Sequence, residues 1–209
     1  MTLQPGTEQP GTKPEVSPAD LRRAVLATSI GNCLEWFDFA VYGYMAVVLG
    51  QLFFPTDDPA SSLLLSFAAF GAAFVVRPLG GMFFGPLGDR VGRRGVLCVI
   101  ILMMSAATFC VGLLPTYATV GVLAPALLVL LRLVQGFTAG GEVTGATAFI
   151  AEYSPDHKRG RTTSWIQFSA TLGFFLGLAA PTLLNLALDQ EQIAAWAWRL
   201  PFLLAGALG

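Results

Sequence analysis

Long apolar stretches, separated by short polar segments, constrain this chain more than any other feature of its sequence. A helix needs about 20 predominantly apolar residues to cross the roughly 30 Å hydrocarbon core of a bilayer. The stretches that reach about this length occupy residues 24–52, 63–87, 96–114, 122–150 and 164–188. A sixth stretch, residues 198–209, is shorter than a full crossing. The pattern predicts an all-α fold, a polytopic bundle of transmembrane helices.

The scarcity of charged residues argues against a soluble domain. Of the 209 residues, 55% are hydrophobic and only 12% are charged, whereas about a quarter of the residues are charged in soluble domains. Such a chain has too few charges to cover a core with a polar surface, and a lipid bilayer removes that need. The net charge of −1 gives no indication of a nucleic-acid partner. We therefore expect membrane lipid around the chain and no nucleic acid bound to it.

The N-terminal 20 residues differ from the rest of the chain. They are rich in Pro, Gly, Thr and Glu and have no apolar period, which predicts a disordered cytoplasmic tail (residues 1–20) before a transmembrane bundle (residues 21–209). They also lack the apolar core and the small-residue cleavage site of a secretory signal.

Residues suited to metal or covalent chemistry are few. The three cysteines lie in apolar stretches without paired spacing, and the single histidine, His157, lies in a polar connection. No nucleophile–base pair, metal cluster or phosphate loop is found in the sequence. We therefore expect no metal, no cofactor and no enzymatic activity.

The connections between the apolar stretches alternate in charge. Basic residues precede the first stretch and occupy the second–third and fourth–fifth connections: Arg22, Arg23, Arg90, Arg93, Arg94, Lys158, Arg159 and Arg161. Acidic residues occupy the first–second and fifth–sixth connections: Asp57, Asp58, Asp189 and Glu191. Because basic connections stay in the cytoplasm, we expect a multi-pass protein of the inner (plasma) membrane with a cytoplasmic N-terminus.

Five ionisable residues lie inside the apolar stretches, where each costs at least about 2.5–3.5 kcal/mol to insert. They are Glu35, Asp38, Arg77, Arg132 and Glu142. Residues of this kind mark a substrate or ion pathway, or pair with one another. Arg132 and Glu142 are ten residues apart on one predicted helix and point in directions that do not require them to pair.

Glu35 and Asp38 are three residues apart, so they share one helix face. Gly31 and Tyr42 continue this face on either side. Two interpretations stay open. The acids are neutralised by Arg77 or Arg132 and fix the packing of helices, or they accept a proton or a cation in a water-filled cavity.

For the glycines and most aromatic residues in the apolar stretches, a structural role is expected before a role in binding. Small residues allow close helix packing in lipid, which is the role expected of Gly136, Gly140, Gly141, Gly145, Gly173 and Gly177. Tryptophans near the ends of stretches anchor a protein at the membrane interface, which is expected of Trp165, Trp196 and Trp198. Trp36 lies in mid-stretch, where an aromatic cluster beside carboxylates packs in the core or binds a quaternary ammonium through cation–π contacts.

The connection "GPLGDRVGRRGVL", residues 85–97, resembles the signature of the second–third loop in the major facilitator superfamily. In physical terms, Gly85 and Gly88 allow close approach, and Gly92 allows a tight turn. Asp89 can neutralise an arginine or cap a helix end.

Further segments resemble the same superfamily. They are "RLVQG" (residues 132–136) and "EYSPDHKRG" (residues 152–160). Together with "GNCLEWFDFAVYG" (residues 31–43), "RPLGG" (residues 77–81) and "GGEVTGA" (residues 140–146), they resemble the metabolite:proton symporter family, and within it the group of bacterial proline/glycine-betaine transporters.

The resemblance implies a fold and an activity. The fold would be the N-terminal six-helix half of a twelve-helix bundle, with a truncated sixth helix, so the chain is expected to be a fragment that lacks a C-terminal six-helix partner. The activity would be secondary active transport by alternating access, the proton-coupled symport of a small zwitterion such as proline or glycine betaine. Other substrates, such as a dicarboxylate or an aromatic acid, remain alternatives, as does a non-transporting membrane scaffold or sensor.

The resemblance also suggests roles for particular residues. Proton coupling is expected of Asp38 and Arg132, with Glu35 and Glu142 as further candidates. The expected substrate cavity contains Asn32, Trp36, Tyr42, Arg77 and Gln135. The expected gating loop contains Gly85, Asp89, Arg90, Gly92, Arg93, Arg94, Glu152 and Arg159.

Overall fold

The structure, a computed structural model, is helical throughout the residues that it describes, 18–153 and 159–208. The elements are α1 (Pro18–Tyr44), α2 (Ala46–Phe53), α3 (Pro59–Val91), α4 (Arg93–Leu113), α5 (Tyr117–Val120), α6 (Leu123–Tyr153), α7 (Arg159–Ala187), α8 (Gln190–Gln192), the π-helical segment η2 (Ile193–Ala197) and α9 (Arg199–Leu208). The predicted all-α fold is confirmed. Most of the predicted N-terminal tail lies outside the described residues, but α1 begins at Pro18, so residues 18–20 are helical.

Among the described residues, four helices are long and apolar enough to cross a membrane: α3, α4, α6 and α7. The predicted first crossing, residues 24–52, is not one straight helix. It consists of α1 and α2, which are bent by 69° at a short break, where Met45 separates them. α9 is a shorter apolar helix, in agreement with the short sixth stretch. The chain is therefore a multi-pass membrane protein.

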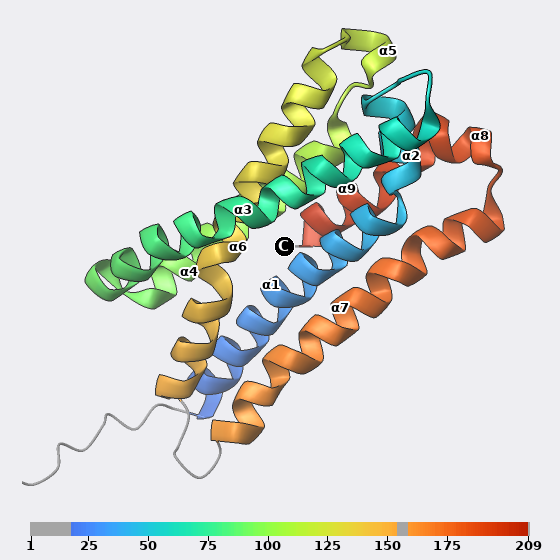
Figure 1. The fold of residues 1–209 in the computed structure, drawn as a ribbon. Helices are drawn as coiled ribbons and strands as arrows, with labels where there is room; N and C mark the ends of the chain where they lie inside the picture. The colour runs from blue at the N-terminus through green and yellow to red at the C-terminus, as the bar shows by residue number, and fades with distance from the viewer. Residues whose placement is uncertain (1–17, 154–158, 209) are drawn as a thin grey trace, which may run out of the picture.

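The helices pack in pairs. α1 lies alongside α7, and α3 packs against α6, while α4 contacts both α6 and α9 (Figure 1). Glycines make two of these contacts close. A Cβ on Gly136 would lie 2.0 Å from the carbonyl oxygen of Ala73 in α3, and a Cβ on Gly173 would lie 2.1 Å from the carbonyl oxygen of Cys33 in α1. The predicted packing role of the glycines is confirmed at these positions, because no side chain fits there.

The connection between α3 and α4 is shorter than predicted. α3 continues to Val91 and α4 begins at Arg93, so Gly92 alone separates them. Gly92 has φ 99°, a conformation that favours glycine, which confirms the tight turn. No described atom lies within 4 Å of a Cβ built on Gly85, and at Gly88 the nearest atom is an ordinary 3.6 Å away, so the described residues show no close approach at these two glycines.

α3 begins with a well-formed cap. The Asp58 carboxylate accepts hydrogen bonds from the backbone N–H groups of Ala60 (3.2 Å) and Ser61 (3.1 Å) and from the Ser61 hydroxyl (2.7 Å). Pro59 follows at the first helical position, where its missing N–H costs nothing. These residues fix the start of the second crossing.

A hydrophobic core lies where the end of α1 meets α2, α4, α6, η2 and α9. Trp198 is at its centre, fully buried, with its ring 5.5 Å from that of Phe53 and 6.4 Å from that of Phe202. The predicted role of Trp198 as an interfacial anchor is therefore wrong. Its position at the end of η2 turns the ring into the bundle, whereas Trp165 and Trp196 are about half exposed.

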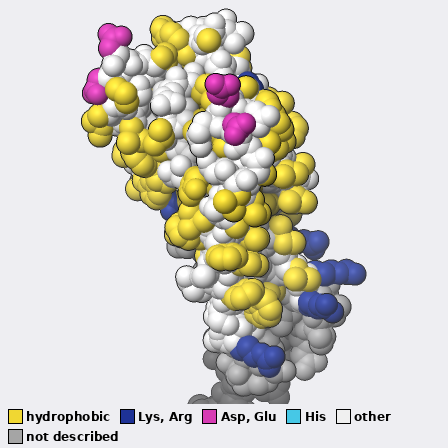
Figure 2. All heavy atoms as spheres, turned by 90° about the vertical axis from the view of Figure 1, so that its right-hand side faces the viewer, with side chains coloured by type: hydrophobic (Ala, Val, Ile, Leu, Met, Phe, Trp, Pro, Cys, Tyr) yellow, Lys and Arg dark blue, Asp and Glu magenta, His cyan; other side chains and the backbone are white. Residues whose placement is uncertain are grey.

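Charged side chains gather towards opposite ends of the face that Figure 2 shows, with a hydrophobic region between them. Asp and Glu side chains lie at the upper end, and most of the visible Lys and Arg side chains lie lower on the molecule. This separation follows from the alternation of basic and acidic connections along the sequence. The orientation of the two ends relative to the cytoplasm stays a prediction.

Candidate ion-coupling site

Asp38 and Arg132 form an ion pair at the centre of the bundle. Nη1 of Arg132 on α6 donates to Oδ2 of Asp38 on α1 over 2.5 Å, and both side chains are fully buried. The amide nitrogen of Gln135 donates to the other oxygen of Asp38 over 3.3 Å and to the hydroxyl of Thr108 on α4 over 2.8 Å. The Asp38 carboxylate thus joins α1 to α6, and Gln135 extends the network to α4.

Tyr42 covers the guanidinium of Arg132. Its ring centroid lies 3.9 Å from Cζ of Arg132, and its hydroxyl donates to the carbonyl oxygen of Ser66 on α3 over 3.1 Å. A cation held over an aromatic face in this way is stabilised by the ring quadrupole. Tyr42 therefore contributes to the burial of the arginine and links α1 to α3.

A second ion pair joins α1 to α3. Nη2 of Arg77 donates to Oε1 of Glu35, whose side chain is fully buried, while the Arg77 side chain keeps 23% of its surface exposed. Cζ of Arg77 lies 4.8 Å from the ring centroids of both Phe39 and Phe74. The two acids on the shared face of α1 therefore have different partners, Arg77 for Glu35 and Arg132 for Asp38.

Glu142 on α6 has a different environment. Its side chain is buried, and neither carboxylate oxygen has a hydrogen-bond donor within the part of the chain that the structure describes. It lies against α1, because a Cβ on Gly31 would be 2.9 Å from its Oε1. Arg132 pairs with Asp38, which agrees with the expectation that Arg132 and Glu142 need not pair.

The five residues predicted to line a substrate cavity fall into two groups. Trp36 and Arg77 keep exposed surface. Tyr42 and Gln135 are fully buried in the network around Arg132. Asn32 is also buried, and its amide nitrogen donates to the carbonyl oxygen of Ile166 (2.7 Å) and to the hydroxyl of Ser169 (3.0 Å), so the structure places it in the contact between α1 and α7.

The predicted aromatic cation site is occupied by the protein's own arginines. The rings of Phe39, Phe74 and Tyr42 face guanidinium groups, while Trp36 packs edge-on against Phe39 with centroids 6.1 Å apart. Thr108 was missed by the sequence analysis, although a hydroxyl in an apolar stretch is a weak signal of a buried polar contact.

The predicted gating loop contains one described ion pair. Nη2 of Arg93 donates to Oδ1 of Asp89 over 3.1 Å, across the turn at Gly92. Asp89 thus neutralises an arginine, as one of its two predicted roles requires. Arg90 and Arg94 are exposed nearby, and the side chains of Glu152 and Arg159 lie outside the described part of the structure.

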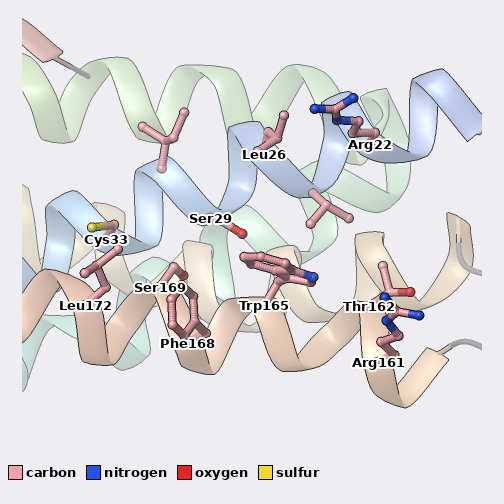
Figure 3. A pocket seen from close by; sticks show the side chains of 12 residues that line it. Arg22, Leu26, Ser29, Cys33, Arg161, Thr162, Trp165, Phe168, Ser169 and Leu172 are labelled. Carbon is pink, nitrogen blue, oxygen red and sulfur yellow. The ribbon is translucent and has the colours of Figure 1, made fainter.

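A groove of about 610 Å³ lies between α1 and α7, away from these pairs. Arg22 and Arg161 lie at one end of it, and Trp165, Phe168 and Leu172 lie along α7 (Figure 3). None of the residues predicted for the substrate cavity lines it. We therefore locate the candidate site at the buried ion pairs rather than in this groove.

A bundle of membrane-crossing helices with ion pairs between helices at its centre defines a class, the polytopic membrane transport proteins, because charges at membrane depth mark transport pathways. Comparison with known proteins agrees. The family described as "Sugar (and other) transporter" matches residues 24–209. The chain belongs to this family, within the major facilitator superfamily, and the prediction that it is not an enzyme is confirmed by that membership.

Solved structures share the fold. The proton:xylose symporter XylE bound to a bromodeoxyglucose aligns with 92% of this chain and 43% of its own length, at a TM-score of 0.79 and 19% identity. XylE of Escherichia coli in an inward-open conformation aligns with 90% of this chain and 45% of its own, at a TM-score of 0.77 and 20% identity. The chain thus has the fold of about half of a major facilitator protein.

Curated relatives are closer in sequence. A proline/betaine transporter of Salmonella typhimurium is 50% identical over 189 residues, which are 90% of this chain and 38% of that protein. A glycine betaine/proline/ectoine/pipecolic acid transporter of Dickeya dadantii shows the same identity and the same coverage of both chains. The predicted resemblance is confirmed, and the chain spans 38% of the length of these relatives.

Proposed function

We propose that this chain forms the N-terminal bundle of a proton-coupled symporter of the bacterial inner membrane, which carries a small zwitterion such as proline or glycine betaine. The names of relatives at 50% identity support the substrate class. The observation that carries the proposal is the fully buried Asp38–Arg132 pair, which joins α1 to α6. A second six-helix bundle would complete the alternating-access machine.

The pair provides a physical link between protonation and conformation. A buried ion pair is stable only while both partners are charged, because each charge has lost its hydration. Protonation of Asp38 would remove the charge that holds Arg132 and weaken the contact between α1 and α6. If α1 and α6 are held together in one transport state and apart in another, binding of the proton shifts the equilibrium between these two states.

Solute contact is assigned to the residues that keep exposed surface. Trp36 offers an aromatic face, which suits the quaternary ammonium of glycine betaine. The Arg77 side chain keeps 23% of its surface exposed, and its guanidinium suits a carboxylate. The two ends of a zwitterion therefore have complementary partners on α1 and α3, which favours a zwitterion over a dicarboxylate, and the names of the relatives favour it over an aromatic acid.

The test is uptake in proteoliposomes. The chain is joined to the remaining part of the Salmonella typhimurium relative, and labelled proline and glycine betaine are offered with and without an imposed pH gradient. We expect uptake that depends on the gradient and is competed by other zwitterions. Competition by a dicarboxylate or an aromatic acid instead would assign another substrate, and absence of all uptake in a correctly inserted protein would favour a scaffold or sensor.

A further inference from the structure

The interior charges of the described bundle do not balance. They are three carboxylates (Glu35, Asp38 and Glu142) and two guanidinium groups (Arg77 and Arg132), each of which is paired with one of the first two acids. Within the described residues, neither oxygen of Glu142 has a hydrogen-bond partner, and both arginines are paired with the other two acids. The proposed mechanism uses Asp38 and Arg132 and does not explain why a third acid is buried.

Glu142 is tightly packed where it faces Gly31 on α1 and Ile101 on α4, and this side of its surroundings is apolar. Glu142 is 1% exposed. A Cβ built on Gly31 would lie 2.9 Å from Oε1 of Glu142 and also 2.9 Å from the side chain of Ile101 on α4. α4 carries no charged residue between Gly95 and Leu113. A carboxylate without donors in such a place is strongly unfavourable, and uptake of a proton removes the penalty.

Two charged groups of the described bundle act on Glu142 from other helices. Glu35 on α1 and Arg77 on α3 both interact with it electrostatically. Oε2 of Glu35 and Nε of Arg77 also have no described hydrogen-bond partner. Glu35, Arg77 and Glu142 therefore form one cluster, with two carboxylates and a single guanidinium between them. Asp38 on α1 and Arg132 on α6 are the other interior charges, and they form their own pair.

We propose that Glu142 is a second proton-binding site, separate from Asp38, and that Glu35 and Arg77 complete it. In the arrangement observed here, Arg77 holds the Glu35 carboxylate, and Glu142 carries the proton. In the alternative arrangement, the proton passes from Glu142 to Glu35, and Arg77 moves its hydrogen bond to the Glu142 carboxylate. The net charge of the cluster is the same in both, so the proton moves without leaving an unpaired charge in the bilayer.

The protonation itself is tested by infrared spectroscopy on the full chain in lipid nanodiscs. A protonated carboxylic acid gives a carbonyl stretch that is well separated from the bands of carboxylates and amides. We expect this band at neutral pH in the wild-type protein, its loss in Glu142→Gln, and its persistence in Asp38→Asn. Persistence in Glu142→Gln, or absence from the wild type, would overturn the proposal. Absence together with a sodium-dependent change in the carboxylate bands would assign a cation instead.

A second measurement tests the proposal on the wild-type chain, and so does not depend on whether Glu142→Gln folds. Labelling of glutamate carboxyl groups with carbon-13 in the wild-type chain must shift the band if a glutamate carries the proton, and must leave it unshifted if an aspartate does. Arg77→Gln removes the guanidinium from Glu35, so we expect a second protonated glutamate and a larger band. An unshifted band in the labelled wild type, or an unchanged band in Arg77→Gln, would contradict the proposed cluster.

The role of this site in coupling rests on the proposed function. In the chimera used for uptake, Glu142→Gln should lower the number of protons that enter with each solute molecule, while solute binding is retained. An unchanged ratio would limit Glu142 to a structural proton. Absence of transport in the unsubstituted chimera would instead reject the proposed function, and the infrared result would still decide the protonation.

Discussion

Arg132 depends on a single carboxylate at the centre of the bundle. Its guanidinium faces Tyr42 at 3.9 Å and, more distantly, Phe202 at 6.0 Å. Nε and Nη2 have no acceptor within the described residues, so the ion pair with Asp38 is the one that neutralises this arginine in the described part of the chain. One carboxylate therefore balances the charge of this buried guanidinium among the described residues.

Replacement of Asp38 by Asn tests whether its proton is the coupling signal. In the chimera we expect Asp38→Asn to abolish accumulation against a gradient, because the side chain no longer changes charge, while solute exchange at equal concentrations remains. Uptake driven by an imposed pH gradient checks this, with the exposed Asp57→Asn as the control. Accumulation that persists in Asp38→Asn would make Asp38 a packing residue, and Glu35 or Glu142 would be substituted next.

Removal of Arg132 has a different expected result, a loss of stability. Arg132→Ala leaves the carboxylate of Asp38 buried without its partner, which costs about 3–5 kcal/mol in comparable buried pairs. Unfolding by denaturant in detergent micelles measures the change in the free energy of unfolding. Arg94→Ala is the matched control, because Arg94 is exposed and such substitutions usually change stability by less than about 0.5 kcal/mol. Equal effects of the two would show that the pair contributes nothing.

The cap of α3 gives the fold a dependence on pH. The hydrogen bond from the Ser61 hydroxyl, followed by those from the backbone of Ala60 and Ser61, holds the pKa of Asp58 below its ordinary value of 3.8. Because folding lowers this pKa, the ionised cap stabilises the protein above that ordinary value, and the stabilisation is lost as the pH falls through the lowered pKa.

We therefore expect Asp58→Ala to lower the thermal unfolding midpoint at neutral pH and to have a vanishing effect in acid. Thermal scans across this pH range check the difference between variant and wild type. Asp57→Ala is the control, because the three cap bonds go to Asp58. A difference that stays constant down to the most acidic pH would contradict the role of the ionised cap.

At the scale of elements, the contact between α3 and α6 depends on glycine. A Cβ at Gly136 would lie 2.0 Å from the carbonyl oxygen of Ala73, and one at Gly140 would lie 1.9 Å from that of Arg77. We expect Gly136→Ala to force the two backbones apart and to destabilise the protein by about 1–3 kcal/mol, the usual cost of overpacking.

Gly71→Ala on α3 is the matched control for this contact. No described atom lies within 4 Å of a Cβ at Gly71, so the substitution should be neutral or stabilising, since Ala is favoured over Gly in helices by about 1 kcal/mol. Denaturant titration in detergent compares the two variants. A stable Gly136→Ala would show that the helices can separate without cost.

The apolar stretches predicted the crossings well, but neither the helix ends nor the breaks. α3 runs four residues past the predicted end at residue 87, to Val91, because backbone hydrogen bonding continues where lipid contact ends. The bend at Met45 and the π-helical turn before Trp198 leave no mark on hydropathy. The rotation of each helix in the bundle is set by packing, which hydropathy does not describe.

The candidate site was predictable as a set of residues, but its pairings were not. Charges inside apolar stretches identified Glu35, Asp38, Arg77, Arg132 and Glu142. Which arginine meets which acid depends on contacts 42 and 94 residues apart in sequence, and no local spacing contains that information. The position of Asn32 was not predictable for the same reason. A polar residue on α1 can form hydrogen bonds with a neighbouring helix as readily as it can line a cavity.

At the scale of the whole molecule, the charge alternation predicts the orientation in the membrane. In a variant in which Cys33, Cys98 and Cys110 are replaced by Ser, single cysteines are placed at Asp57, Asp189 and Arg94. Because basic connections stay in the cytoplasm, an impermeant maleimide added outside the cell should label positions 57 and 189 and leave position 94 unlabelled until the membrane is opened. Labelling at 94 but not at 57 would reverse the orientation.

The glycine contacts have a mechanical consequence for the bundle. In the helix pairs α1–α7 and α3–α6, the two backbones are in direct contact at glycines, without an intervening side chain. We therefore expect each pair, called a doublet below, to be rigid. Glu35–Arg77 and Asp38–Arg132 run from one doublet to the other. If the proposed coupling holds, a change of charge on these acids would weaken the contact between the two helix pairs and leave each pair intact, so a proton would act by rotating one pair relative to the other.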